Sequence, residues 1–333
     1  MMSVKHIIAF ALTLLLFFGA RGQSGEGRAT LHFLSLPATT KSMALGGVTT
    51  SIVASDAALA LESPALFGVE QHGQLSLSYM NYLSDTHLGS VFYARQLGQR
   101  GAWGIGGRYL DHGQQEERDL RGEFISVFGA KEIAIQASYS YELTDYLRAG
   151  ITLKAAYLRL GDYMAWGVGT DLGLNYFSED KERSVGLSLV NLGRLITPLG
   201  GGRAEPLPWD IRLGYSQKFA HAPIQLHLTA YSLRPKHRGE FEPELGTAGQ
   251  VARHLSLGVE YVPSNKFWVG VGYNPRIAQD YYAIRGSKFA GVSLGIGFNA
   301  VGYRVAVAST SYGGSFWAFM ATFSTDFGLI NRL

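Results

Sequence analysis

The sequence contains no cysteine, which excludes a disulfide framework, a thiolate metal site and a thiol nucleophile. Charge is also scarce, since 17 % of the residues are charged and the net charge is only +3, so we expect no nucleic-acid partner. Two residue classes are in excess instead. Glycine accounts for 42 of the 333 residues, well above the usual share of roughly 7 %, and aromatic residues make up 12 %, which favours β-structure.

Long apolar runs are missing from the chain except at its start. Residues 7–18 form an apolar run that follows Lys5 and His6, and it is shorter than the roughly 20 residues that a membrane-spanning helix needs. Ala20 and Gly22 then supply the small residues of a cleavage site. We therefore predict a signal peptide over residues 1–22, with an N-terminal membrane anchor as the alternative, and no transmembrane helix in the mature chain.

From about residue 73 the sequence alternates between apolar and polar residues, as strands with two different faces do. Clear examples are residues 133–142, 147–157 and 166–176. Strands of soluble domains average about 5 to 6 residues, whereas a tilted strand needs about 9 to 11 to cross a bilayer. Alternating segments of roughly ten residues are typical of a transmembrane β-barrel.

The pattern predicts an all-β outer-membrane barrel of about 14 antiparallel strands, an even number as a single-chain bacterial barrel requires. The connections after even-numbered strands are short, whereas the long loops 110–131, 193–208, 233–253 and 274–288 all follow odd-numbered strands. Outer-membrane barrels have short periplasmic turns and long extracellular loops. The predicted strands are 74–83, 87–97, 102–109, 132–142, 147–159, 165–177, 184–192, 209–219, 224–232, 254–262, 267–273, 289–298, 303–310 and 316–326.

Side-chain chemistry agrees with a membrane-spanning wall. Aromatic residues flank the short turns, where a girdle would meet the lipid headgroups; they are Tyr141, Tyr146, Tyr176, Phe177, Phe219, Tyr261, Phe267, Trp268, Phe298 and Tyr303. The polar phase carries charges that would each cost a few kcal/mol in hydrocarbon. We expect these charges, Arg108, Lys154, Asp171, Arg212, Glu260 and Arg304, to face the lumen, as a salt-bridge network rather than a substrate path.

Glycines share that polar phase, which explains much of the glycine excess. Gly167, Gly173, Gly272 and Gly295 are examples. A side chain there would crowd the interior of the barrel or whatever fills it.

The segment before the strands breaks the alternation. It contains Phe33–Pro37, Ala44–Val48 and Asp56–Leu66, with small apolar residues and short helical stretches, and we expect it inside the barrel. Together with Leu75–Tyr82 and Asn191–Gly193 it resembles the PorV/PorQ group of the Bacteroidota type IX secretion system, most closely the PorQ-like members. Family members usually carry Asn before Pro-Ala, where this chain has Ser63.

The resemblance implies a domain plan and a role. Residues 23–72 would form an N-terminal plug and residues 73–333 the barrel, as in FadL transporters. The protein would be a non-catalytic outer-membrane anchor that holds a PorZ-like surface protein in the attachment complex, which processes cargo and links it to anionic lipopolysaccharide. The sortase-like protease with its PorV-like barrel and outer-membrane lipid are further expected contacts. A FadL-type channel for hydrophobic molecules and a PorV-like cargo shuttle remain the alternatives.

We expect no catalytic, cofactor or metal site. Residues 291–295 match a nucleophile-elbow pattern but lie within an alternating strand, without the strand-turn-helix context that the motif requires. Partner binding is expected in the extracellular loops, whose mixed charges suit the polar rim of an interface. The candidate partner-binding residues are Arg118, Arg121, Arg234, Lys236, Arg238, Glu240, Glu242, Arg276, Tyr281 and Tyr282.

Overall fold

A computed structural model describes residues 30–52, 56–118, 121, 123–201, 204–234, 245–285 and 288–327. All of them belong to one compact unit. The predicted signal peptide lies outside the described residues, as do Lys236, Arg238, Glu240 and Glu242. No helix in the described ranges is long and apolar enough to span a bilayer.

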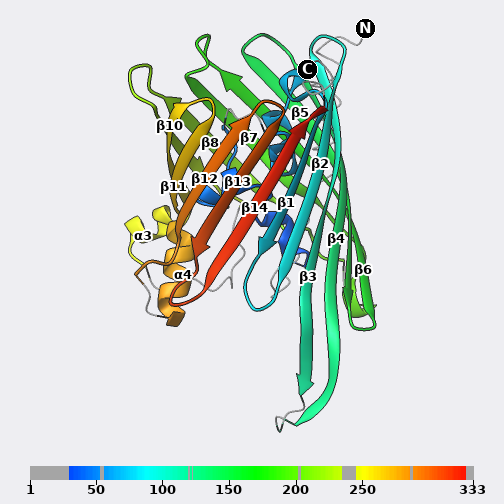
Figure 1. Cartoon of the computed structure of the whole chain (residues 1–333). Coiled ribbons are helices and arrows are strands. Elements are labelled where there is room, and N and C mark those ends of the chain that lie inside the picture. The colour runs from blue at the N-terminus through cyan, green and yellow to red at the C-terminus, as the bar shows by residue number, and fades with distance from the viewer. Residues whose placement is uncertain are drawn as a thin grey trace. The chain divides into compact units, whose positions relative to one another are not determined.

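Fourteen antiparallel strands close into a barrel in which each strand pairs with its neighbours in sequence and β1 pairs with β14 (Figure 1). This confirms the predicted fold. The strands are β1 (Gln74–Asn81), β2 (His87–Leu97), β3 (Gly101–Arg118), β4 (Phe124–Glu142), β5 (Leu147–Leu160), β6 (Tyr163–Phe177), β7 (Arg183–Thr197), β8 (Asp210–Lys218), β9 (Ile224–Ala230), β10 (Leu255–Ser264), β11 (Phe267–Tyr273), β12 (Val292–Ala300), β13 (Tyr303–Ser311) and β14 (Trp317–Asp326).

Burial alternates along the strands as the sequence pattern predicts. Large apolar side chains on one phase are exposed on the outside of the wall, for example Leu153, Ile135 and Phe319. An apolar surface of this extent is costly in water and suits hydrocarbon. The opposite phase is buried and carries polar and charged residues.

Several short helices precede β1, and their ends follow from local chemistry. Helix α2 (Thr40–Ala44) begins at Thr39, whose side chain accepts a hydrogen bond from the Ser42 N–H at 3.1 Å. It is followed by Gly46 and Gly47, both at positive φ, a conformation that glycine adopts without strain. The 3₁₀ turns of this segment are η1 (His32–Ser35), η2 (Ala57–Leu61), η3 (Pro64–Leu66) and η4 (Val69–Gln71).

The described residues between 31 and 73, which we call the plug segment, are almost entirely buried. Its helices contact strands on many sides of the barrel, from β2 to β6 and from β11 to β14. In Figure 1 it appears in blue within the ring of strands. The lumen is therefore filled by the chain's own N-terminal segment.

The connections differ at the two ends of the barrel. The end with the short turns, called the turn end, contains for example residues 265–266 and 301–302. The opposite end, called the loop end, carries η5 (Leu199–Gly201), α3 (Thr247–Ala252) and α4 (Pro275–Arg285). The long connections that follow β7, β9 and β11 all lie at the loop end, as predicted, whereas the β5–β6 connection there spans only residues 161–162.

One predicted loop is wrong. Residues 110–131 form most of a long hairpin, because β3 runs to Arg118 and β4 starts at Phe124 (Figure 1). The sequence lacks apolar alternation there, since this part of the hairpin has no buried face. Its strands are held by pairing with each other, from Gln114 opposite Gly129 to Arg118 opposite Phe124.

The predicted aromatic girdle is correct for most of its members but wrong for two. Tyr141, Tyr176 and Phe298 are exposed on the outside of the wall. Phe177 and Trp268 are buried and face inwards, because each directly adjoins an outward-facing aromatic neighbour and side chains alternate along a strand.

Candidate functional site

Arg108 shows how the wall holds the plug segment. Its guanidinium lies in the lumen and donates to the carbonyl oxygens of Leu34, Leu36 and Pro37 at 3.1, 2.6 and 3.2 Å. A single β3 side chain thus binds three carbonyl groups within four consecutive residues of the plug segment. Buried carbonyl groups need hydrogen-bond donors. Arg108 supplies them and so holds the plug segment against the wall.

A second contact joins β5, β6 and β7. Lys154 lies 2.6 Å from Asp171 and also donates to the Asn191 side chain at 2.8 Å. The Asn191 N–H donates to Asp171 at 2.6 Å. Pairing between β6 and β7 shifts at Thr170/Leu172 and Asn191 has a φ of 56°, so this buried cluster stabilises a bulge in the wall.

Lys154 and Asp171 thus form an ion pair within the lumen, as expected, whereas Arg108 binds backbone carbonyl groups instead. Glycines add direct backbone contact between plug segment and wall. A Cβ on Gly186 would lie 1.9 Å from the Thr50 carbonyl oxygen, and one on Gly272 would lie 2.3 Å from the Gly46 nitrogen. The glycine excess on the polar phase is therefore explained by close packing against the plug segment.

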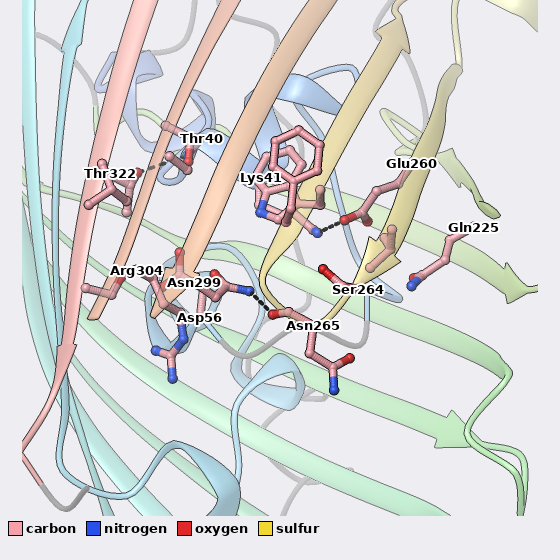
Figure 2. Close-up of a pocket in the computed structure, with 16 residues that line it drawn as sticks. Thr40, Lys41, Asp56, Gln225, Glu260, Ser264, Asn265, Asn299, Arg304 and Thr322 are labelled. Atoms are coloured by element: carbon pink, nitrogen blue, oxygen red, sulfur yellow. Dashed lines mark hydrogen bonds and ion pairs between the residues drawn. The ribbon is translucent and has the colours of Figure 1, made fainter. Parts of the chain in front are cut away.

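A cavity lies at the turn end of the lumen, beside α2. Its volume is about 340 Å³, and Figure 2 shows the Lys41 side chain pointing towards Glu260 in its lining. Lys41 and Glu260 form an ion pair, and the Lys41 ammonium lies 4.2 Å from the centre of the Trp268 ring. Other lining residues are Thr40, Asp56, Gln225, Val262, Ser264, Asn265, Phe267, Asn299, Arg304, Val305, Ala306, Thr322 and Ser324.

The charged groups that line the cavity largely compensate one another. Arg304 lies 3.9 Å from Asp326, and Asp56 accepts hydrogen bonds from Ser76 and from the Ala58 N–H. Burial lowers the pKa of Lys41, although the neighbouring Glu260 opposes this effect. Such a lining places charged groups of both signs beside apolar side chains such as Val262 and Trp268.

Near the cavity, two hydrogen bonds and one longer contact between charged groups lead from the plug segment across three strands. Ser51 and Ser216 hydroxyls lie 2.7 Å apart, and Ser216 lies 2.8 Å from His227 Nδ1. His227 Nε2 lies 3.5 Å from Glu260. The sequence pattern identified Glu260 but missed His227, which shares the inward phase of β9 and could have been found by that alternation.

Glu62 is the acidic centre of the plug segment itself. It accepts hydrogen bonds from the Ala38 N–H at 2.8 Å and the Ser42 hydroxyl at 2.7 Å. Burial raises the pKa of Glu62 above its ordinary value of 4.5, although these donors oppose the rise. The folded protein therefore holds this proton to a higher pH than the unfolded chain does.

We expect Glu62 to make stability fall as the pH rises. Its contribution is fully present below about pH 4.5 and is lost as the pH rises towards the folded-state pKa. Glu62→Gln removes this dependence while keeping the side chain's shape. In urea unfolding of detergent-solubilised protein between pH 4 and 8, wild type should lose stability relative to the variant. A constant difference between the two proteins at every pH would contradict the assignment.

At the loop end, the predicted partner-binding residues have different surroundings. Arg276 donates to Ser232 at 2.9 Å and lies 4.0 Å from Asp280. Tyr281 packs edge-on against Tyr312, while Tyr282 is exposed. Asp280, which is exposed, also pairs with the buried Arg253 at 2.7 Å, a contact that the sequence did not suggest.

The remaining candidates lie on two other segments. Arg118 ends β3, Arg121 is exposed near the tip of the hairpin, and Arg234 follows β9 and is partly buried. The structure thus brings Arg276, Tyr281 and Tyr282 together on α4 and leaves Arg118 and Arg121 on the β3–β4 hairpin. Their role in partner binding stays a prediction.

Helix α4 is attached to the plug segment. Asn274, just before α4, donates to the Gly46 carbonyl oxygen at 2.9 Å and accepts from the Tyr231 hydroxyl at 2.7 Å. Tyr312 packs between Tyr82 and Tyr281. Helix α4 at the loop end is therefore fixed to the plug segment in the lumen.

No protein-family model and no curated protein matches the chain. Solved structures do. The Pseudomonas putida toluene transporter TodX is 15 % identical over 87 % of this chain and 97 % of its own, with a TM-score of 0.55, and a deltaS2 mutant of the TodX monoaromatic hydrocarbon channel is 13 % identical over 86 % and 98 %, with a TM-score of 0.57.

A Pseudomonas aeruginosa FadL homologue is 12 % identical over 87 % of this chain and 98 % of its own, with a TM-score of 0.51. Identities this low carry information about the fold only. The chain is a closed, FadL-like barrel of fourteen strands.

Proposed function

We propose that this chain is an outer-membrane barrel of the type IX secretion system that anchors a PorZ-like protein at the cell surface. The observation that carries the proposal is the occupied lumen. Arg108, Lys154 and Asp171 are buried there in contacts that fix the plug segment and the wall. Such contacts between the plug segment and the wall make a rigid barrel, which is suited to holding a partner.

Membrane placement is supported by the outer surface. Exposed apolar residues cover the middle of the strands, and exposed aromatic residues such as Tyr141 and Tyr176 lie near the turns. This is the arrangement of an outer-membrane barrel. By the same rule the turn end would face the periplasm and the loop end the exterior.

The loop end supplies the surface for a partner. Ion pairs of Asp280 with Arg253 and Arg276 hold helix α4 in place. The side chain of Asn274, just before α4, also donates a hydrogen bond to Gly46 of the plug segment. A pre-organised surface loses less conformational freedom on binding than a mobile loop does. The surface therefore suits a lasting complex, as expected for an anchor.

The channel alternative has the fold similarity in its favour, because two of the similar structures are named as a toluene transporter and a monoaromatic hydrocarbon channel. It requires an apolar pocket beside the plug segment and a lateral opening in the wall. The cavity beside α2 instead contains Lys41, Glu260, Asp56 and Arg304. All fourteen neighbouring strand pairs are hydrogen-bonded in the described residues, with local register shifts.

The proposal is tested by affinity purification of the tagged barrel from mildly solubilised outer membranes of its native host. We expect the PorZ-like surface protein to co-purify at a fixed ratio, and deletion of the barrel gene to release that protein from cells. Recovery of the barrel alone, with unchanged surface attachment, would contradict the proposal. Loss of uptake of an apolar compound would favour the channel, and binding of cargo C-terminal domains would favour the shuttle.

A further inference from the structure

The β3–β4 hairpin extends beyond both neighbouring strands. Pairing of β2 with β3 ends at His87 opposite Asp111, and pairing of β4 with β5 ends at Ala130 opposite Leu160. Further out, β3 and β4 pair with each other as far as Arg118 and Phe124, and Figure 1 shows this ribbon projecting at the loop end. A two-stranded ribbon is marginally stable by itself, and its edges expose unpaired backbone groups.

The two edges of this ribbon differ in sequence. The β3 edge contains Glu116, Glu117 and Arg118. Charged residues protect an edge strand from pairing with a strand of another chain. On β4, residues 124–129 read Phe-Ile-Ser-Val-Phe-Gly, without charge or proline. Phe124, Ile125 and Val127 are 58, 55 and 48 % exposed. An uncharged apolar edge invites strand pairing unless something covers it.

The backbone direction at this edge follows from one hydrogen bond. The Gly161 N–H donates to the Gly129 carbonyl oxygen at 3.0 Å, so the backbone groups of Gly129 point towards the β5 side. Backbone N–H and C=O groups of a strand residue point to one side and alternate along the strand. Val127 therefore directs both groups to the open edge, whereas Ser126 and Phe128 direct theirs to β3.

The edge lies beyond the apolar band of the wall. Lys131 is on the same outward phase as Ile133 and Ile135, and its ammonium lies 3.7 Å from Asp111. This ion pair marks the end of the lipid-facing surface on these strands. Val127 lies four residues before Lys131 on β4, on the side away from the apolar band. The distance between the two residues is roughly 13 Å at about 3.3 Å per residue. Its surroundings are therefore water or protein, not acyl chains.

We propose that the outer edge of β4, residues 124–129, binds a β-strand of the surface protein that the barrel anchors. The inference rests on the proposed function and names the contact within it. Main-chain hydrogen bonds to Val127 would extend the ribbon by one strand, and Ile125 and Val127 would pack against side chains of the added strand. The open edge and its exposed apolar side chains are both accounted for by one occupant.

The test removes the outward N–H and leaves the hairpin pairing intact. Proline is tolerated in an edge strand where its N–H would face solvent, so Val127→Pro should lower the yield of co-purified PorZ-like protein at least tenfold. Val127→Thr keeps the N–H and should bind as wild type does. Heat-modifiable migration on gels checks that each barrel is folded. Wild-type yield from a folded Val127→Pro barrel would overturn the inference.

A second measurement does not depend on the fold of the proline variant. Because the chain has no cysteine, Val127→Cys can be labelled at one site with a photo-reactive benzophenone. We expect a crosslink to the PorZ-like protein, and Ile151→Cys, on the lipid-facing wall, should give none. A crosslink to a second barrel or to lipid alone would overturn the strand-docking inference. If wild type captures no PorZ-like protein, the proposed function itself fails, which is a distinct result.

Discussion

Lys154→Met is expected to lower the free energy of unfolding by about 3 to 5 kcal/mol, the usual effect of removing one partner from a buried ion pair. The Lys154 and Asp171 side chains are 3 and 0 % exposed and 2.6 Å apart. Without the ammonium, the buried Asp171 side chain would lose the partner that offsets the cost of its burial. Asn191, which bonds both side chains, would lose an anchoring donor.

The double variant Lys154→Met, Asp171→Leu is the matched control. It removes both charges, and replacing a buried pair by apolar residues is often close to neutral. We expect it to recover most of the loss, measured by urea unfolding in detergent with tryptophan fluorescence. Equal stability of Lys154→Met and wild type would contradict a structural role for this pair. A double variant less stable than the single one would place the effect in the bulge itself.

Much of the barrel could be predicted because its wall obeys one period. Side chains along a strand alternate between hydrocarbon and lumen, so residues such as Ile151 and Thr152 report their faces directly. The hairpin beyond Asp111 could not be predicted in this way, since both of its faces are exposed and pairing alone forms it. Trp268 was wrongly placed in the outward girdle together with Phe267. Adjacent side chains of a strand point to opposite faces, so only one of the two can face the lipid.

For the contacts in the lumen, the sequence predicted the charged residues of the wall but not their partners in the plug segment. Arg108 and Glu260 were identified as inward charges by their phase. Their partners could not be found, because the plug segment has no period that would fix its path. The Leu34 carbonyl oxygen and the Lys41 ammonium reach those charges only through tertiary structure.

The loop end and the turn end are linked through one short helix. Thr40 and Lys41 at the start of α2 line the turn-end cavity, and Gly46, just after α2, accepts from Asn274 next to α4. A load on α4 would therefore act on the plug segment as well as on the wall. Close packing of the plug segment against glycines of the wall limits how far it can move.

Gly186→Ala tests that packing directly. The new Cβ would lie 1.9 Å from the Thr50 carbonyl oxygen. This clash can be relieved only if the backbone of the wall or of the plug segment moves. We expect a loss of about 1 to 3 kcal/mol in the free energy of unfolding, as for other overpacked cores. The measurement is urea unfolding in detergent at fixed pH.

Gly89→Ala is the matched control, because Gly89 lies in β2 and a Cβ there would meet no atom within 4 Å. Both variants make the same chemical change in a strand, so intrinsic strand preference cancels between them. Gly89→Ala should leave stability within about 0.5 kcal/mol of wild type. Equal effects of the two substitutions would mean that the plug segment yields at Thr50, and a filled but movable lumen would then bring the channel alternative forward.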